Sequence, residues 1–148
     1  MDLRLRVRRA RRDDLDRVRS LLGAPASPLP AERKRWRRLV STLREDLYLA
    51  EREEDAVLVG LVVIVYARGL GPPAAIVRHL LGASDATARA LLECARTRAL
   101  AHGCARLEVQ LAHDAPFDTS LAARLLGTGW QLGPQTLIWS FPQEIGPS

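Results

Sequence analysis

The longest apolar segment of the chain, residues 56–67 (AVLVGLVVIVYA), sets the first limit on its fold. Its β-branched residues favour a buried strand at Val57–Ala67, and it is much shorter than the ~18 apolar residues of a membrane span. A second strand is predicted at Leu47–Glu51, and the charged segment Glu51–Asp55 is interpreted as a solvated hairpin tip. The sequence therefore predicts an antiparallel hairpin within a sheet.

The other elements follow from apolar periodicity on either side of this hairpin. They are a strand at 3–7, a helix that Asp13 caps and Gly23 ends, a helix from Pro30 with an apolar stripe of Trp36, Leu39, Val40 and Leu43, the hairpin, a strand at 75–81, a helix at 86–101, a strand at 107–111, a short helix at 120–126, and two final strands that end at Phe141. This order, β-α-α-β-β-β-α-β-α-β-β, predicts an α/β (α+β) fold with a mixed, mostly antiparallel central sheet flanked by helices. With 148 residues, the chain is expected to be one domain (1–148), with a core at about 3–141 and a tail at 142–148.

Basic residues are concentrated at one end of the chain. Of the 22 lysines and arginines, 13 lie in residues 1–38 beside only five acidic residues, so this segment carries +8. The rest, with nine basic and 12 acidic residues, carries −3. Such a charge can attract an acidic partner, but aromatic residues make up only 5% and none alternates with arginine as a base-stacking surface requires. A solvated charged face is favoured, and binding of an acidic partner by this segment is kept as a weaker alternative.

The two cysteines and three histidines lack the close spacing of a metal site, so no metal is expected. Cys94 and Cys104 are interpreted as small core residues rather than as a disulfide framework. No apolar signal segment follows the charged N-terminus, and we expect a soluble cytoplasmic protein.

Four local motifs resemble the GNAT (N-acetyltransferase) superfamily in their order and spacing. Val7–Leu15 is similar to the family's opening I-R-x-A-x-x-x-D-L junction, and Leu49–Leu61 is similar to its hairpin. Arg89–Cys104 resembles the R-A-L-L-E-…-G-C helix, and Gly129–Trp130 resembles the G-F pair after the last short helix. The resemblance covers residues 3–141 and implies a GNAT fold with a divergent acetyl-CoA motif.

In this family, backbone N–H groups of a Q/R-x-x-G-x-G/A turn hold the cofactor pyrophosphate at the start of the central helix. The resemblance places that turn at residues 83–88, where Ala83 replaces the leading Arg or Gln and Ala86 replaces the first glycine. Asp85 puts a carboxylate where the pyrophosphate would lie. An ordinary helix start with Ser84 or Asp85 as N-cap is the favoured competing interpretation. The candidate residues for acetyl-CoA binding are Leu81, Gly82, Ala83, Ser84, Ala86, Thr87 and Ala88.

The resemblance also indicates where catalytic groups would lie. The family's general acid, usually a Tyr four residues before the G-F glycine, corresponds to Leu125, which has no proton to give. Asp118 corresponds to the Asn that often opens the preceding helix. His79 is the candidate general base because imidazole titrates near neutral pH, although a structural role is favoured for it.

Two functions are therefore compared. The favoured one is a GNAT-fold domain whose acetyl transfer is weakened or lost and which serves as a binding or interaction module. The alternative is an active N-acyltransferase that uses acetyl-CoA on an unidentified amine, with backbone N–H groups of Ala75–Leu81 at the thioester carbonyl. A homodimer through the terminal strands is compatible with both, whereas membrane and nucleic-acid partners are not expected.

Overall fold

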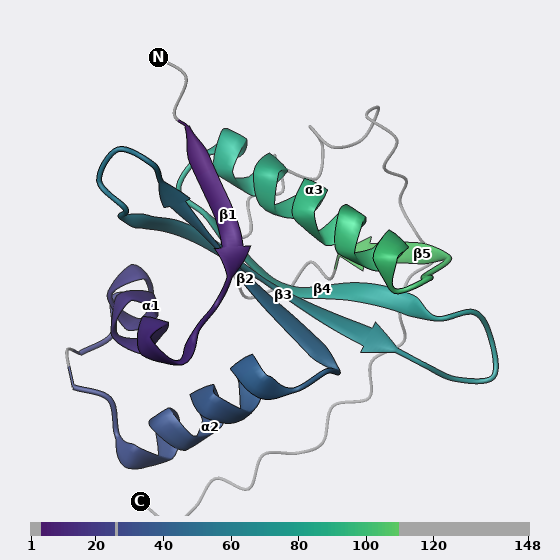
Figure 1. Ribbon diagram of the computed structural model, residues 1–148, viewed down its shortest axis with the longest axis horizontal. Coiled ribbons are helices and arrows are strands. Elements are labelled where there is room, and N and C mark those ends of the chain that lie inside the picture. Colours follow the sequence, from purple (N-terminus) through teal and green to yellow (C-terminus); the bar gives the residue numbers. More distant parts are fainter. Residues whose placement is uncertain (1–3, 26, 110–148) are drawn as a thin grey trace, which may run out of the picture. The chain divides into compact units, whose positions relative to one another are not determined.

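The predicted strands assemble into one five-stranded sheet (Figure 1). The computed structural model describes residues 4–25 and 27–109, which form β1 (Leu5–Arg9), the 3-10 turn η1 (Arg12–Asp14), α1 (Leu15–Leu21), α2 (Pro30–Ser41), β2 (Glu45–Arg52), β3 (Leu58–Ala67), β4 (Ala74–Gly82), α3 (Asp85–Ala101) and β5 (Arg106–Val109). The order β-α-α-β-β-β-α-β predicted for this part is confirmed, as is the mixed, mostly antiparallel sheet. The short helix and the two strands predicted beyond residue 110 lie outside the described residues.

The strand order in the sheet follows the chain, β1-β2-β3-β4-β5. Neighbours from β1 to β4 are antiparallel. Short turns connect β2 to β3 and β3 to β4, whereas η1, α1 and α2 lie between β1 and β2. β5 is parallel to β4, because α3 carries the chain back to the end of the sheet at which β4 began. The strand–helix–strand unit β4-α3-β5 thus sets one edge of the described sheet.

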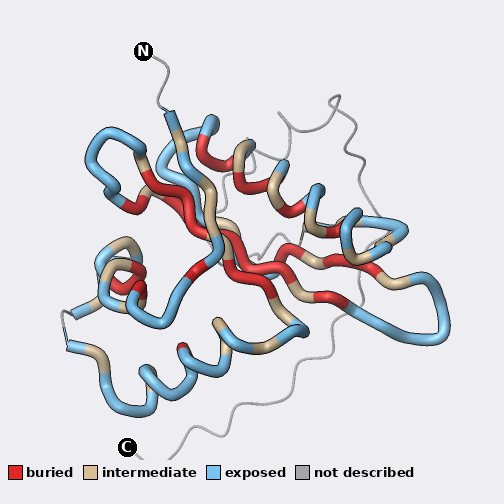
Figure 2. The backbone as a smooth tube through the Cα atoms, viewed as in Figure 1, coloured by how far each residue is buried: buried red, intermediate tan, exposed pale blue. Residues whose placement is uncertain are grey.

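The helices cover opposite faces of this sheet. On one face, β2 and β3 contribute a core that α1 and α2 complete, and its buried members are Ala10, Val18, Trp36, Leu47, Leu49, Leu58, Leu61 and Val63. On the other face, Gly60 of β3 lies against Thr87 and Leu91 of α3. Figure 1 shows α3 on the side away from α1 and α2, and Figure 2 shows the buried strands between them.

The second helix forms where Pro30 predicts its start, with the proline in the first turn. Trp36 is buried as expected, and its indole N–H donates a 3.0 Å hydrogen bond to the carbonyl oxygen of Arg11. The prediction that Leu43 continues the apolar stripe is wrong. The helix ends at Ser41, so Leu43 falls beyond its last turn and is 87% exposed.

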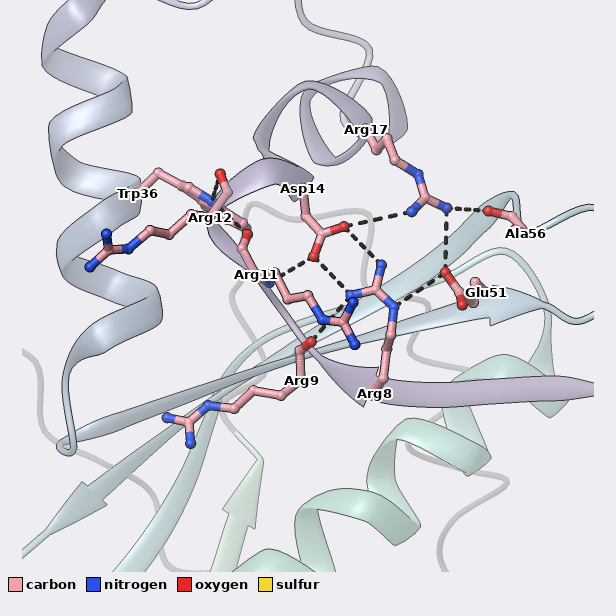
Figure 3. A network of polar contacts seen from close by, with 9 residues as sticks. All are labelled: Arg8, Arg9, Arg11, Arg12, Asp14, Arg17, Trp36, Glu51 and Ala56. Atoms are coloured by element: carbon pink, nitrogen blue, oxygen red, sulfur yellow. Dashed lines mark hydrogen bonds and ion pairs between the residues drawn. The ribbon is translucent and has the colours of Figure 1, made fainter.

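An ion-pair network joins β1, η1, α1 and β2 (Figure 3). Asp13 is not the N-cap of α1 as predicted, because η1 intervenes and Asp14 is the acidic residue that organises the junction. Its carboxylate accepts two 2.8 Å hydrogen bonds from Arg8 and lies 3.6 Å from Arg17. Glu51 is not part of a solvated tip, since it is buried and its carboxylate lies 3.3 Å from Arg8. These four side chains tie the first helix to the sheet.

The chain divides into two units, residues 1–112 and 113–148, and every described element belongs to the first. A single domain over residues 1–148 therefore stays a prediction. None of the described helices is long and apolar enough to cross a membrane.

Candidate functional site

A bulge in β4 shapes the sheet edge at the predicted cofactor site. The antiparallel ladder pairs Val63 with His79 and Ile64 with Val77, so Arg78 is the extra residue between these pairs. A bulge of this kind bends a strand and increases its local twist. The described ladder between β4 and β5 covers only the part of β4 before the bulge. This ladder ends at the pair Val77–Val109, which is also where the described residues end.

The first turn of α3 packs tightly against the end of β4. A Cβ atom on Gly60 would lie 2.6 Å from the Leu81 carbonyl oxygen and 2.7 Å from Cγ2 of Thr87. A Cβ atom on Gly82 would lie 3.0 Å from the backbone nitrogen of Ala88. The two glycines permit this approach because they have no side chain. The candidate residues on β4 and those on α3 are thereby brought together as the sequence predicts.

The backbone donors of this turn are partly used within the chain. The Ser84 hydroxyl accepts a 3.2 Å hydrogen bond from the N–H of Thr87, which confirms Ser84 as the N-cap of α3. The N–H of Ala88 donates to the Ser84 carbonyl at 3.0 Å, and that of Ala83 donates to the Val59 carbonyl at 2.9 Å. In this conformation, three N–H groups of the predicted phosphate turn already have partners.

Charge at the helix start differs from that of a simple anion site. Asp85 occupies the first position of α3 and is exposed, as are Ser84 and Ala86 beside it. Its carboxylate interacts favourably with the positive end of the helix dipole, and the same carboxylate repels any phosphate that approaches there. The site thus combines an attractive dipole with a repulsive side chain.

His79 lies on β4 next to the bulge and is exposed. Its pairing with Val63 puts it on the sheet face that α1 and α2 cover. Leu125 and Asp118, the positions matched to the family's acid and helix-opening Asn, lie outside the described residues. Among residues 4–25 and 27–109, no group of three or more His, Cys, Asp or Glu side chains could hold a metal ion.

A buried polar cluster at the other end of α3 was missed in the sequence. The Asp46 carboxylate accepts a 2.5 Å hydrogen bond from the Tyr66 hydroxyl and lies 3.3 Å from Arg98 and 3.2 Å from Arg9. The ring of His102 stacks on Tyr66 at 3.8 Å between centroids. Burial and the Asp46 carboxylate raise the pKa of the Tyr66 hydroxyl. The feature of the sequence that could have revealed this cluster is Asp46, an acidic residue at a buried position of β2.

Solved structures with the same fold were found across almost the whole chain. A transcriptional regulator from Bacillus halodurans C-125 is 19% identical, with a TM-score of 0.74 over 93% of this chain and 100% of that one. The glucosamine-6-phosphate N-acetyltransferase of Arabidopsis thaliana is 11% identical, with a TM-score of 0.73 over 94% of this chain and 99% of that one. AAC(6')-Iy, in complex with the bisubstrate analog CoA-S-monomethyl-acetylneamine, is 12% identical, with a TM-score of 0.73 over 95% of this chain and 99% of that one.

No family model matches the sequence, and no curated protein matches it. The structural likeness nevertheless defines the class: the chain has the fold of the GNAT N-acetyltransferases. The GNAT resemblance is therefore confirmed at the level of the fold.

Proposed function

We propose that this GNAT-fold chain binds an acyl-CoA, preferably acetyl-CoA, along β4, and that its acyl transfer is weak or lost, so that it serves as a binding module. The observation that carries the proposal is the bulge at Arg78, which interrupts the β3–β4 ladder directly before the end of β4 that packs against the start of α3. A bulge turns backbone groups of a strand away from the regular ladder, and such groups can pair with an extended ligand that carries amide groups. The pantetheine arm of CoA has that chemistry.

The chain's own residues support one end of this ligand better than the other. The β4 backbone beyond Arg78 would hold the arm, and the N-terminus of α3 beside Gly82 would face the pyrophosphate. Because Ser84 already caps α3 and Asp85 adds a negative charge, the pyrophosphate would be held less firmly than by an uncharged turn. We therefore expect binding that is measurable but modest.

The weak-transfer part of the proposal rests on the sequence. When bound, acetyl-CoA supplies an activated acyl thioester. The leaving thiolate needs a proton donor, and Leu125 at the matched position provides none. The active N-acyltransferase is the second candidate, and one observation favours it: His79 is exposed next to the bulge, where it could accept a proton from an amine.

Calorimetric titration of the full chain with acetyl-CoA and with CoA tests the proposal. We expect a dissociation constant in the micromolar to millimolar range. The Asp85→Asn variant should bind about two- to fivefold more tightly, which corresponds to about 0.3–1 kcal/mol of charge interaction at a helix N-terminus. The matched control is Asp55→Asn, which removes the same charge from an exposed residue of the hairpin between β2 and β3.

If neither the wild-type chain nor the Asp85→Asn variant gives heat of binding at millimolar acetyl-CoA, the binding proposal is overturned. An assay of CoA release with a panel of amines then separates the two functions, because the module predicts release at or little above the uncatalysed rate. Release that His79→Gln abolishes without changing the dissociation constant would establish the active transferase instead. The predicted homodimer is tested in the same samples by light scattering.

A further inference from the structure

The structure gives the basic residues of the N-terminal segment different surroundings. Some pair with acidic residues of the fold: Arg8 and Arg17 pair with Asp14 and Glu51, and Arg9 pairs with Asp46. Others are gathered on the outside of α2. We call these five residues the α2 basic face, and they are Arg33, Lys34, Arg35, Arg37 and Arg38. All five are exposed, and none makes an ion pair with a described residue.

The other side chains of α2 bear on the charge of this face. Glu32, the one acidic residue of α2, pairs with Arg19 of α1 and so faces the first helix. Trp36 is buried against the core. Lys34, Arg37 and Arg38 are three and four residues apart, so they share one side of the helix, where like charges destabilise it. An anionic partner at this face would remove that cost.

We propose that the α2 basic face binds the phosphate backbone of duplex nucleic acid without regard to sequence. A rigid helix presents its side chains at fixed intervals, and arginine pairs bidentately with phosphate. Duplex DNA offers one negative charge per ~1.7 Å of its axis, a density that matches several adjacent cations. Contacts to phosphates position a protein on a duplex and carry no base information, so no base-reading residue is needed.

Two other anionic partners fit this face less well. Helices that lie in a membrane surface need an exposed apolar side, but Trp36 is buried and Leu39 and Val40 pack against the core below the helix. Single-stranded nucleic acid is held mainly by stacking on aromatic side chains. The five residues of the α2 basic face include no aromatic residue. Charge without stacking or apolar anchors favours the duplex.

The experiment is fluorescence anisotropy of the full chain with a labelled 25-base-pair duplex, at 50, 100 and 200 mM salt. The test variant replaces Lys34, Arg37 and Arg38 by Gln, a good helix former that leaves exposed positions uncharged. The control variant replaces Arg68, Arg96 and Arg106 by Gln, so it has the same net charge but loses its cations elsewhere. Circular dichroism checks that both variants keep their helix content.

We expect the binding constant of the wild type to fall linearly with salt on logarithmic axes. The test variant should reduce that slope by about 2.7, since each phosphate contact contributes about 0.9, while the control keeps the slope. No duplex binding at 50 mM salt, or an equal loss in both variants, would overturn the proposal. Tighter binding to anionic vesicles, to polyglutamate or to a single strand of equal length would also overturn it, in favour of that partner.

Discussion

The Arg8 guanidinium and the Asp14 carboxylate form a bidentate pair, with two hydrogen bonds of 2.8 Å each (Figure 3). The two side chains are 14% and 4% exposed, so water screens the pair poorly. Asp14 also accepts a 2.7 Å hydrogen bond from the backbone N–H of Arg11. One carboxylate therefore fixes both the end of β1 and the turn that leads into α1.

Replacement of Asp14 by Asn should destabilise the protein by about 2 to 4 kcal/mol, because it leaves the half-buried Arg8 with only Glu51 as an anionic partner. Urea unfolding followed by circular dichroism measures the change. The control is Asp55→Asn, which breaks the exposed pair with Arg52 and should have little effect. Equal effects of the two substitutions would contradict a special role for the buried pair.

The stability of the protein should depend on pH through the same carboxylate. The Arg8 hydrogen bonds lower the pKa of Asp14 below its ordinary value of 3.8. A lowered carboxyl pKa stabilises the fold above the ordinary value, and this contribution is lost as the pH falls through the lower, folded value. The stability difference between wild type and Asp14→Asn should therefore be constant from pH 7 to pH 5 and shrink below about pH 4. A difference that grows on acidification would contradict this account.

Removal of the Tyr66 hydroxyl should weaken the buried cluster below the end of α3. Tyr66→Phe deletes the 2.5 Å hydrogen bond to Asp46, and we expect a loss of about 1 to 3 kcal/mol in the free energy of unfolding. Tyr48→Phe is the control, since the described residues give the Tyr48 hydroxyl no hydrogen bond while its ring keeps the contact with Arg98. Thermal melts of both variants make the comparison. If Tyr48→Phe is as destabilised as Tyr66→Phe, the hydrogen bond of the Tyr66 hydroxyl is not the source of the stability.

A methyl group at Gly60 should separate α3 from the sheet. It would meet backbone as well as side-chain atoms closer than 3.0 Å, so Gly60→Ala should cost about 1 to 3 kcal/mol of stability. It should also weaken any acyl-CoA binding, because the start of α3 moves. Gly69→Ala meets nothing within 4 Å and should change stability by less than about 0.5 kcal/mol. Unfolding curves and the calorimetric titration above measure both effects.

Cys94 should react slowly with alkylating reagents in the folded protein. Burial raises the pKa of its thiol to about 11, so only about one molecule in a thousand is the reactive thiolate at pH 8. Mass spectrometry of iodoacetamide-treated protein should show labelling about a hundredfold slower than in urea, where the thiol has its ordinary pKa. Equal rates in both solvents would mean that the thiol is accessible and unperturbed.

Much of the fold was predictable because it depends on patterns that are local in the sequence. Alternation and β-branched runs predict β2, β3 and β4 closely, and Pro30 and Ser84 mark two helix starts. The wrong predictions concern residues whose environment other segments decide. Asp13 is predicted as the N-cap of α1, but η1 moves that position to Asp14. Glu51 is predicted as part of a solvated tip, yet it is buried because Arg8 and Arg17 come to it from other elements.

The candidate site was predictable as a set of neighbours but not in its geometry. Its residues follow one another along the chain, so their grouping needed no tertiary information. The bulge at Arg78 depends on how β4 aligns with β3, and the internal use of the Ala83 N–H depends on Val59 of the neighbouring strand. Long-range pairing decides such contacts, and apolar periodicity does not encode them.

By itself, the sequence determined the order of the elements, the class of fold and the excess of arginine near the N-terminus. Only the tertiary structure decided which of those arginines are neutralised. Arg8 and Arg17 meet carboxylates brought from β2 and η1, whereas the cations of the α2 basic face are exposed and pair with no carboxylate of the described residues. The reason is that a charge near the core is stable only beside an opposite charge, and the fold alone determines which charges meet.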